Sequence, residues 1–326
     1  MSLKPQKQQI GFTDLSMEGI LKPFQDHPLL QIKRRFPFER FDPILNQLYS
    51  NTGRPGFDPG KMLRLLLLGK LQNLSDKRLE QDVALHLLYR EFCGWSLEEL
   101  TPDHSTLSRF RDRITPVWDK IWSEFQTWLQ EEGLVDQDLV IVDATDIRAQ
   151  GRYRKPPEDP SGCSTPEDKY EQQTDPDARH GYKRVDKPIY GYKAHIATDA
   201  KTGMILTLLT TGANAHDGKT LPQVVPKLPF DPRALTADTI YHDWENKRYL
   251  EAAGIEDCTI PKQRHGGIQT LAQRMRKRIE RINSLLKVVC GLSRTRFFGR
   301  LNVDFDLQLG ALAVNLVNLR GLIQTA

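Results

Sequence analysis

The chain has 326 residues, of which 39% are hydrophobic, and a net charge of +4. This length exceeds one average domain, so two domains are expected. The four cysteines are scattered without a CxxC pair, which excludes a disulfide framework and a cysteine-ligated zinc site. The first residues lack the apolar run of a signal peptide, and apolar runs such as Leu65 to Leu68 are too short to cross a bilayer. We therefore expect a cytoplasmic protein with no membrane contact.

Residues 1–135 are predicted to form an all-α domain. Phe57-Asp58-Pro59-Gly60 is a helix-start signal before a leucine-rich run, and Ser75 is suited to cap the next helix. A further helix is expected from Leu107, and it carries Arg109, Arg111 and Arg113. Two helices joined by a short turn, with Ser and Arg near the start of the second, give the outline of a helix-turn-helix. A small helical bundle with a charged surface has the same pattern.

Residues 136–326 alternate between predicted strands and helices. An apolar run, Leu139 to Val142, ends in Asp143, as expected of a buried strand. Residues 150–188 are rich in proline and charge and predict a long exposed insertion. The later elements are a hairpin of strands 190–199 and 204–211, a helix 217–225, a strand 233–238, a helix 245–253, a strand 258–260, a helix 268–290 and a helix 305–323.

This order of elements is the ribonuclease-H-like topology. Three strands in a meander come first, and alternating helices and strands then join them in one mixed sheet. The predicted fold is therefore α/β, with a ribonuclease-H-like mixed-sheet domain preceded by the all-α domain.

Three acidic residues fall at related places in this topology. Asp143 closes the first strand, Asp238 closes the fourth, and Glu280 lies in the long helix. Because the first and fourth strands are neighbours in such a sheet, we expect their ends to bring Asp143 and Asp238 together, although 238 − 143 = 95 residues separate them. Each acid alone is also compatible with a strand cap, a turn or a surface ion pair. Asp146 is a rival to Asp143, but it lies past the predicted strand end.

The long helix has two stripes on a wheel of about 100° per residue. The apolar stripe contains Met275, Ile279, Ile282, Leu286 and Val289. The polar stripe contains Gln273, Arg276, Glu280, Asn283 and Lys287. A carboxylate on the polar stripe can reach a metal at the sheet edge while Arg276 and Lys287 hold phosphates.

Positive charge is concentrated around this helix. From Lys262 to Arg300, eleven Lys and Arg residues accompany one acid, so the segment carries +10 and the rest of the chain 4 − 10 = −6. Such a block is typical of contact with a phosphate backbone, although a solvated helix face can have the same composition. Three carboxylates suit two Mg²⁺ ions about 3.5–4 Å apart, which activate a nucleophile and neutralise phosphate charge.

The sequence also resembles a known family along nearly its whole length: bacterial insertion-sequence transposases of the DDE class with an InsH-type N-terminal domain. The segments that carry the resemblance are 56–59, 102–111, 142–145, 174–178, 191–195, 213–217, Ala237-Asp238, and Arg276, Glu280 and Lys287. The sequence departs from the family at two places. It has Gln273 where the family signature on this helix has Tyr, and it has Thr239-Ile240-Tyr241 after the second acid, where the family often has Lys-Gly-Tyr. His216 and Asp217 are predicted to form a turn and a helix cap.

The resemblance implies that Asp143, Asp238 and Glu280 bind two Mg²⁺ or Mn²⁺ ions. It further implies that the N-terminal domain binds terminal inverted repeats of double-stranded DNA, with Arg109, Arg111 and Arg113 as candidate contacts. Two DNA ends must meet for transposition, so a homodimer on DNA is expected, associated with the bacterial nucleoid. The alternatives are a stand-alone nuclease of the same fold, such as a resolvase, and a non-catalytic DNA-binding regulator.

Overall fold

The computed structural model describes residues 17–49, 56–154, 168–171, 173–184, 187–261 and 271–323. The chain divides into two compact units. The first holds the described residues up to Gly69 together with Leu74–Arg111, and the second holds Lys70–Asn73 and the described residues from Asp112 onward. Within the described ranges, no helix has the length and apolar character needed to cross a membrane.

The first unit is helical, as the sequence predicts. Its main helices are α1 (Met17–Leu21), α2 (Pro28–Arg35), α3 (Asp42–Leu45), α4 (Pro59–Leu71), α5 (Asp76–Leu85), α6 (Leu87–Cys93) and most of α7 (His104–Ile114), with 3-10 turns at Lys22–Phe24, Phe38–Phe41 and Asn46–Leu48. The apolar residues of α4 are buried on all its sides, including Met62, Leu63 and the run from Leu65 to Leu68. A helix with apolar residues on every side is enclosed by others, so α4 supplies the core of this unit.

Side chains cap the first turns of three helices in this unit, and two of these helices begin where the sequence predicts. Asp58 accepts a hydrogen bond from Lys61 N at 2.8 Å, and Ser75 accepts one from Arg78 N at 3.3 Å. Asp103 accepts from Thr106 N at 2.6 Å, and this bond holds the pKa of the Asp103 carboxyl at about 2, below its usual value. Because Asp103 is the cap, α7 begins at His104 and not at the expected Leu107.

The second unit is built on a mixed sheet. Its strands are β1 (Leu139–Arg148), β2 (Arg179–Arg184), β3 (Lys187–Asp199), β4 (Ile205–Gly212), β5 (Ala234–Ala237) and β6 (Glu256–Asp257). The strand order is β2-β3-β1-β5-β6, with β4 paired to β3. β1 runs antiparallel to β3 and parallel to β5. The first and fourth predicted strands are therefore neighbours, as the sequence indicates.

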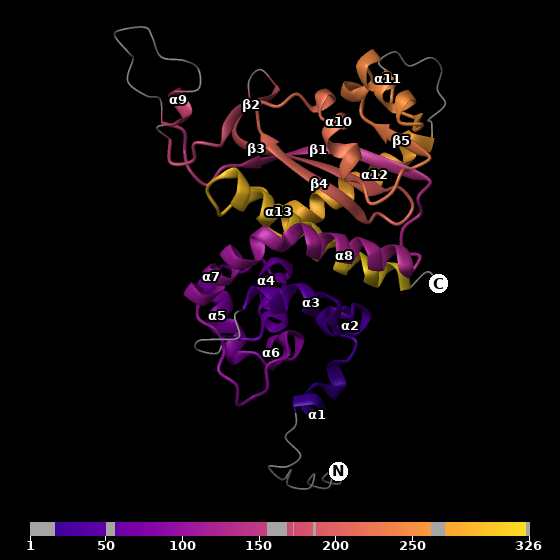
Figure 1. The fold of residues 1–326 in the computed structure, drawn as a ribbon. Helices are drawn as coiled ribbons and strands as arrows, with labels where there is room; N and C mark the ends of the chain where they lie inside the picture. Colours follow the sequence, from indigo (N-terminus) through magenta and orange to yellow (C-terminus); the bar gives the residue numbers. More distant parts are fainter. Residues whose placement is uncertain are drawn as a thin grey trace, which may run out of the picture. The chain divides into compact units, whose positions relative to one another are not determined.

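Helices cover both faces of this sheet. The helices of this unit are α8 (Trp118–Glu131), α9 (Asp168–Glu171), α10 (Leu221–Val224), α11 (Trp244–Ala252), α12 (Leu271–Ser284) and α13 (Arg300–Ile323), with 3-10 turns at Thr115–Val117, Asp217–Lys219, Val225–Lys227 and Thr239–Tyr241. Figure 1 shows α10 and α11 on one face and α12 and α13 on the other. A π-helical turn, Leu285–Val289, continues α12. Alternate residues of β1 therefore meet different helices.

α8 belongs to the sheet-containing unit, although the sequence suggested that the first domain extends to residue 135. Trp122 Nε1 donates to Leu206 O at 3.2 Å, and Gln126 Nε2 donates to Ile205 O at 3.1 Å. Asn315 of α13 binds both backbone groups of Ile205. Its Oδ1 accepts from Ile205 N at 2.8 Å, and its Nδ2 donates to Ile205 O at 2.9 Å. These side chains occupy backbone groups of β4 that a neighbouring strand would otherwise pair, and so protect the sheet from further pairing.

Three predicted elements of the second unit differ from the structure. β2 and α9 lie inside the stretch 150–188 that was expected to be an exposed insertion, while residues 155–167 lie outside the described part. The expected helix 217–225 is broken into two 3-10 turns around α10, since Pro222 and Pro226 lack the amide hydrogens that a continuous helix needs. The expected strand 258–260 forms two residues earlier, as β6.

Candidate active site

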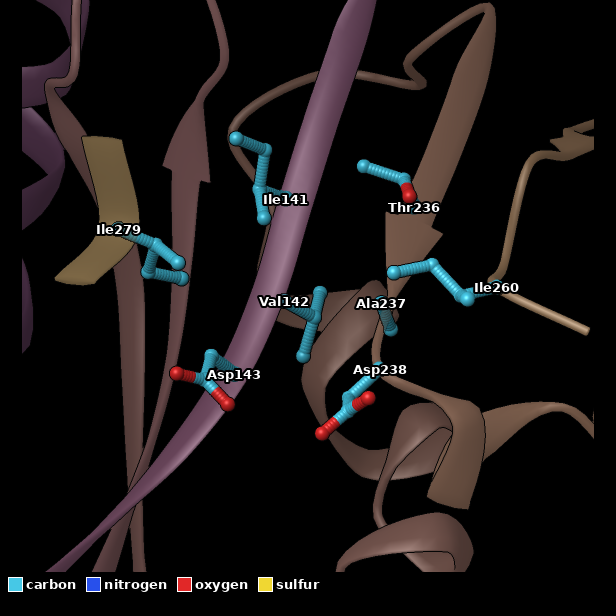
Figure 2. Close-up of a pocket in the computed structure, with 8 residues that line it drawn as sticks. All are labelled: Ile141, Val142, Asp143, Thr236, Ala237, Asp238, Ile260 and Ile279. Carbon is cyan, nitrogen blue, oxygen red and sulfur yellow. The ribbon is translucent and has the colours of Figure 1, made fainter. Parts of the chain in front are cut away.

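The parallel pairing of β1 and β5 determines where the two aspartates lie. Ile141 pairs with Thr236 and Val142 pairs with Ala237, so the next residue of each strand is an aspartate, Asp143 or Asp238. Both aspartates line one small pocket, together with Ile141, Val142, Thr236, Ala237, Ile260 and Ile279. Figure 2 shows both carboxylates at the same end of this pocket. The sheet brings together residues that are distant in the sequence, as predicted.

The prediction that Asp143 closes its strand is wrong, because β1 stays paired with β3 as far as Arg148 and both Asp143 and its rival Asp146 lie within it. The alternation of β1 nevertheless separates the two aspartates. Val140 and Val142 are in the buried cluster that contains residues of α10 and α11, whereas Ile141 packs with Ile279 of α12. Successive strand side chains point to opposite faces, so Asp143 shares the α12 face with Ile141, and Asp146 shares the other face with Val142. Asp146 is also paired in register with Lys193 of β3. The geometry favours Asp143 as the partner of Asp238.

Asp238 is held in place by the turn that follows β5. Its carboxylate accepts hydrogen bonds from Thr239 N at 2.6 Å and from Thr239 Oγ1 at 3.2 Å. Asp238 thereby caps the 3-10 turn Thr239–Tyr241, with its own backbone still extended (φ −67°, ψ 166°). Both bonds are accepted by Oδ1, and together they fix the orientation of the Asp238 side chain.

α12 packs against β1 next to the two aspartates. Ile279 is 1% exposed and contacts Ile141 and Ala200. One turn later, Asn283 Nδ2 donates a hydrogen bond to Asp143 Oδ2 at 3.0 Å. The polar stripe predicted for this helix therefore reaches the aspartates through Asn283, a residue that sequence reasoning placed on the stripe without a role. A bond between side chains 140 residues apart has no local sequence signal.

Glu280 lies on the same helix but is exposed. It is three residues before Asn283, and residues at this spacing are neighbours on a helix surface. It does not line the pocket of Asp143 and Asp238. Among the described residues, no three His, Cys, Asp or Glu side chains are grouped closely enough to hold a metal ion. The structure thus brings two of the predicted acids together and sets the helix of the third against the same strand.

Comparison with protein families identifies the chain. Residues 18–113 match a family model described as a transposase domain (DUF772). Residues 135–316, more than half of the chain, match the transposase DDE domain. The chain belongs to the DDE transposases.

The family match determines the kind of reaction. This insertion-sequence transposase is an enzyme that cleaves DNA and transfers DNA strands with divalent metal ions, and its mixed sheet is the ribonuclease-H-like fold. The paired aspartates lie in the matched DDE region, as does Glu280. A transposase match in both halves of the chain favours a transposase over a stand-alone nuclease or a regulator without activity.

The two cations of the predicted stripe lie around Glu280 in the transposase sequence. Arg276 is in α12, but its side chain, like that of Gln273, is outside the described part of the structure. Lys287 is half-buried in the π-helical turn Leu285–Val289. Arg278 has a structural role, because its Nη1 donates to Ala200 O at 2.6 Å in the turn between β3 and β4.

The three arginines of α7 differ in exposure. Arg111 is 8% exposed, and its Nη2 donates to the Asp76 carboxylate at 2.8 and 3.0 Å. This ion pair of the buried Arg111 with the half-buried Asp76 joins α7 to α5, so Arg111 is not available as a DNA contact. The sequence holds a signal for this, since Leu107, Phe110, Arg111 and Ile114 have the i, i+3, i+4, i+7 spacing of a buried face. Arg109 and Arg113 are exposed, and Arg109 Nη2 donates to Ser105 Oγ at 2.9 Å.

A buried polar network lies on the other face of the sheet. His195 is fully buried, with Nε2 2.9 Å from Thr211 Oγ1 and Nδ1 3.4 Å from Thr220 Oγ1. Burial lowers the pKa of His195 to about 4, so the ring is neutral at neutral pH. Asp217 begins a 3-10 turn, as the sequence predicts, and accepts from Lys193 Nζ at 2.7 Å. These residues stabilise the sheet behind the aspartates and lie on the face opposite Asp143.

Proposed function

We propose that this transposase binds the terminal inverted repeats of its own element and catalyses both strand cleavage and strand transfer at the Asp143–Asp238 edge of the sheet. The observation that carries the proposal is the register of β1 and β5, in which each aspartate directly follows the last paired residue and both line one pocket. We further propose that Asp143, Asp238 and Glu280 hold two divalent cations, Mg²⁺ or Mn²⁺.

The donor set fits these cations. Mg²⁺ prefers hard oxygen ligands and is usually held by one or two carboxylates together with substrate phosphate. Asp143 and Asp238 are half-buried, and both line the pocket. The exposed Glu280, one turn before the residue that bonds Asp143, can join them by a change of side-chain rotamer or by a small movement of α12 when DNA binds.

In this mechanism the protein binds and orients, and it forms no covalent bond with DNA. When bound, the cations supply an activated oxygen nucleophile and a stabilised leaving oxygen for in-line displacement at phosphorus. Asp143 and Asp238 fix the cations relative to the sheet. Arg276 and Lys287 hold phosphates of the DNA, and Arg109 and Arg113 contact the transposon ends.

The proposed partners are double-stranded DNA and a second copy of the chain. Both transposon ends must be held beside the target DNA before strands are joined, so the active form on DNA is a homodimer at least. In the bacterial cell such a complex is located on the nucleoid.

The test measures DNA strand cleavage and strand transfer on DNA that carries the flanking inverted repeats, with Mg²⁺ or Mn²⁺ present. It compares the wild type with Glu280→Gln. The wild type is expected to release a 3′-hydroxyl end and join it to target DNA, whereas Glu280→Gln loses about 100-fold or more in both steps because one metal ligand is lost. Glu251→Gln removes a charge from an exposed position on α11 and is the matched control. Cleavage without strand transfer by the wild type would indicate a nuclease, and full activity of Glu280→Gln would remove this residue from the site.

A further inference from the structure

The hydrogen bond between Asn283 and Asp143 has a feature that packing does not explain. Asn283 Nδ2 donates to Asp143 Oδ2, but Asn283 Oδ1 is buried and accepts no hydrogen bond within the described part of the chain. A buried acceptor without a donor lowers the stability of the fold. An apolar side chain of similar size would avoid this cost. Asparagine at this position is therefore better explained by what its amide does for Asp143.

The neighbours of Asn283 on α12 show what packing requires there. Ile279, Ile282 and Leu286 are each no more than 3% exposed and form the apolar stripe of the helix. These residues form the buried side of the helix, and Asn283 is not one of them. Asn283 is half-buried at the edge of this stripe, where the helix faces the aspartates.

We propose that Asn283 is a positioning residue for Asp143. Its amide holds one carboxylate oxygen, so the side-chain angles of Asp143 are restricted and the remaining lone pairs keep one orientation. Carboxylates that ligate metals are commonly held in this way by a second group. This role rests on the proposed function, in which Asp143 binds a cation.

The chemistry of an amide suits this role. A lysine or arginine at this position would also donate to Asp143, but its charge would oppose a cation at the same carboxylate. The neutral amide orients the carboxylate and leaves its negative charge available to the metal. Because Asn283 is also one turn from Glu280, the same hydrogen bond fixes the helix that carries the third acid to the strand that carries the first.

The experiment uses the full-length protein with two variants. Asn283→Leu keeps the branched shape of the side chain and removes the donor, and Asn283→Ala removes both the shape and the donor. Ser284→Ala is the matched control, because Ser284 is exposed on the same helix and makes no capping hydrogen bond. Asp143→Ala is the reference for loss of the ligand. Mn²⁺ binding is measured by electron paramagnetic resonance, thermal unfolding is measured without metal, and cleavage is measured over a range of Mn²⁺ concentrations.

Both Asn283 variants are expected to bind Mn²⁺ roughly tenfold to 100-fold more weakly than the wild type, the usual effect of removing a group that orients a metal ligand. Asn283→Leu should unfold at the wild-type temperature or above, because no buried acceptor remains. Its cleavage rate should recover at high Mn²⁺ concentration, whereas that of Asp143→Ala should not. Ser284→Ala should behave as the wild type.

Two sets of results contradict the proposal and separate it from the proposed function. Wild-type Mn²⁺ affinity in Asn283→Leu, with binding lost in Asp143→Ala, overturns the positioning role alone. Wild-type binding and cleavage in Asp143→Ala, or a wild-type protein that takes up no Mn²⁺, overturns the proposed function and the positioning role with it.

Discussion

The paired part of β1 and β5, which positions Asp143 and Asp238, and the helix that carries Glu280 are held in different ways. The two aspartates directly follow the paired residues Leu139–Val142 and Ala234–Ala237, all of which except Leu139 are buried, so the backbone ladder sets their separation. Glu280 is exposed on α12, and side-chain contacts of Ile279 and Asn283 hold this helix next to β1. Backbone hydrogen bonds determine the first part of the site, and side-chain packing determines the second.

This difference indicates which part of the site can adapt. A ladder of backbone hydrogen bonds opens only at a large cost, whereas a helix held by a few side chains can shift by small amounts. The aspartates are therefore preorganised in the protein without DNA, and Glu280, the proposed third ligand, is the residue whose position can respond to substrate. The variants below test this division, from the largest expected effect to the smallest.

Asp238→Asn is expected to have the largest effect. The amide oxygen can still cap the turn at Thr239, so the fold should be retained, but the charge that holds a cation is lost. Metal ions contribute several kcal/mol to such reactions, and we expect cleavage to fall about 1,000-fold or more. The rate of end cleavage with Mg²⁺ measures this. Asp146→Asn, on the other face of β1, is the control. A larger loss of cleavage in Asp146→Asn than in Asp238→Asn would contradict the choice of Asp143 over Asp146.

The pH dependence of the free energy of unfolding tests the sheet, which is the rigid part of the site. In the unfolded chain His195 takes up a proton near pH 6.5, but in the folded chain burial lowers its pKa to about 4. The unfolded state therefore binds more protons between these values, and the free energy of unfolding falls as the pH drops through this window, by at most about 1.4 kcal/mol per pH unit.

Urea unfolding at a series of pH values measures this dependence. His195→Gln can still bond the two neighbouring threonines and does not titrate, so its stability should fall less steeply between pH 6.5 and 4. Equal slopes in the two proteins would show that protonation of His195 does not limit the stability of the sheet.

Ile279→Val is expected to have the smallest effect and tests how tightly α12 is held. Removing one buried methyl group next to Ile141 should cost about 0.5–1.5 kcal/mol of folding free energy, measured by urea unfolding. Val288→Ala, at a position that is 71% exposed, should change stability by less than about 0.5 kcal/mol. If Ile279→Val leaves stability unchanged but lowers cleavage, docking of this helix matters only in the DNA complex.

The sequence predicts the preorganised part of the site better than the adaptable part. An apolar run before an acid indicates a buried strand, and the topology then implies that Asp143 and Asp238 are neighbours. The end of β1 could not be predicted in this way, because pairing with β3 continues the strand to Arg148. The fold could be predicted in the same way, except where pairing does not depend on apolar side chains. β2, with the sequence Arg-His-Gly-Tyr-Lys-Arg, lacks an alternating pattern and forms because β3 offers it backbone partners.

Contacts between distant side chains account for the other differences. The Asn283–Asp143 hydrogen bond and the Arg111–Asp76 ion pair each join residues that are far apart in the sequence. A helical wheel places such residues on a stripe, but only the folded chain supplies the partner. Arg111 is thereby a buried link between helices, although its charge suggested a DNA contact.

The π-helical turn after α12 alters the expected phase of the basic residue that follows Glu280. A π turn closes its hydrogen-bonded ring over five residues, so each residue advances less around the axis than in an α-helix. A helical wheel drawn at about 100° per residue therefore overestimates the rotation about the helix axis between Glu280 and Lys287. Glu280 and Lys287 are seven positions apart in the sequence, yet the angle between their side chains is set by this local unwinding.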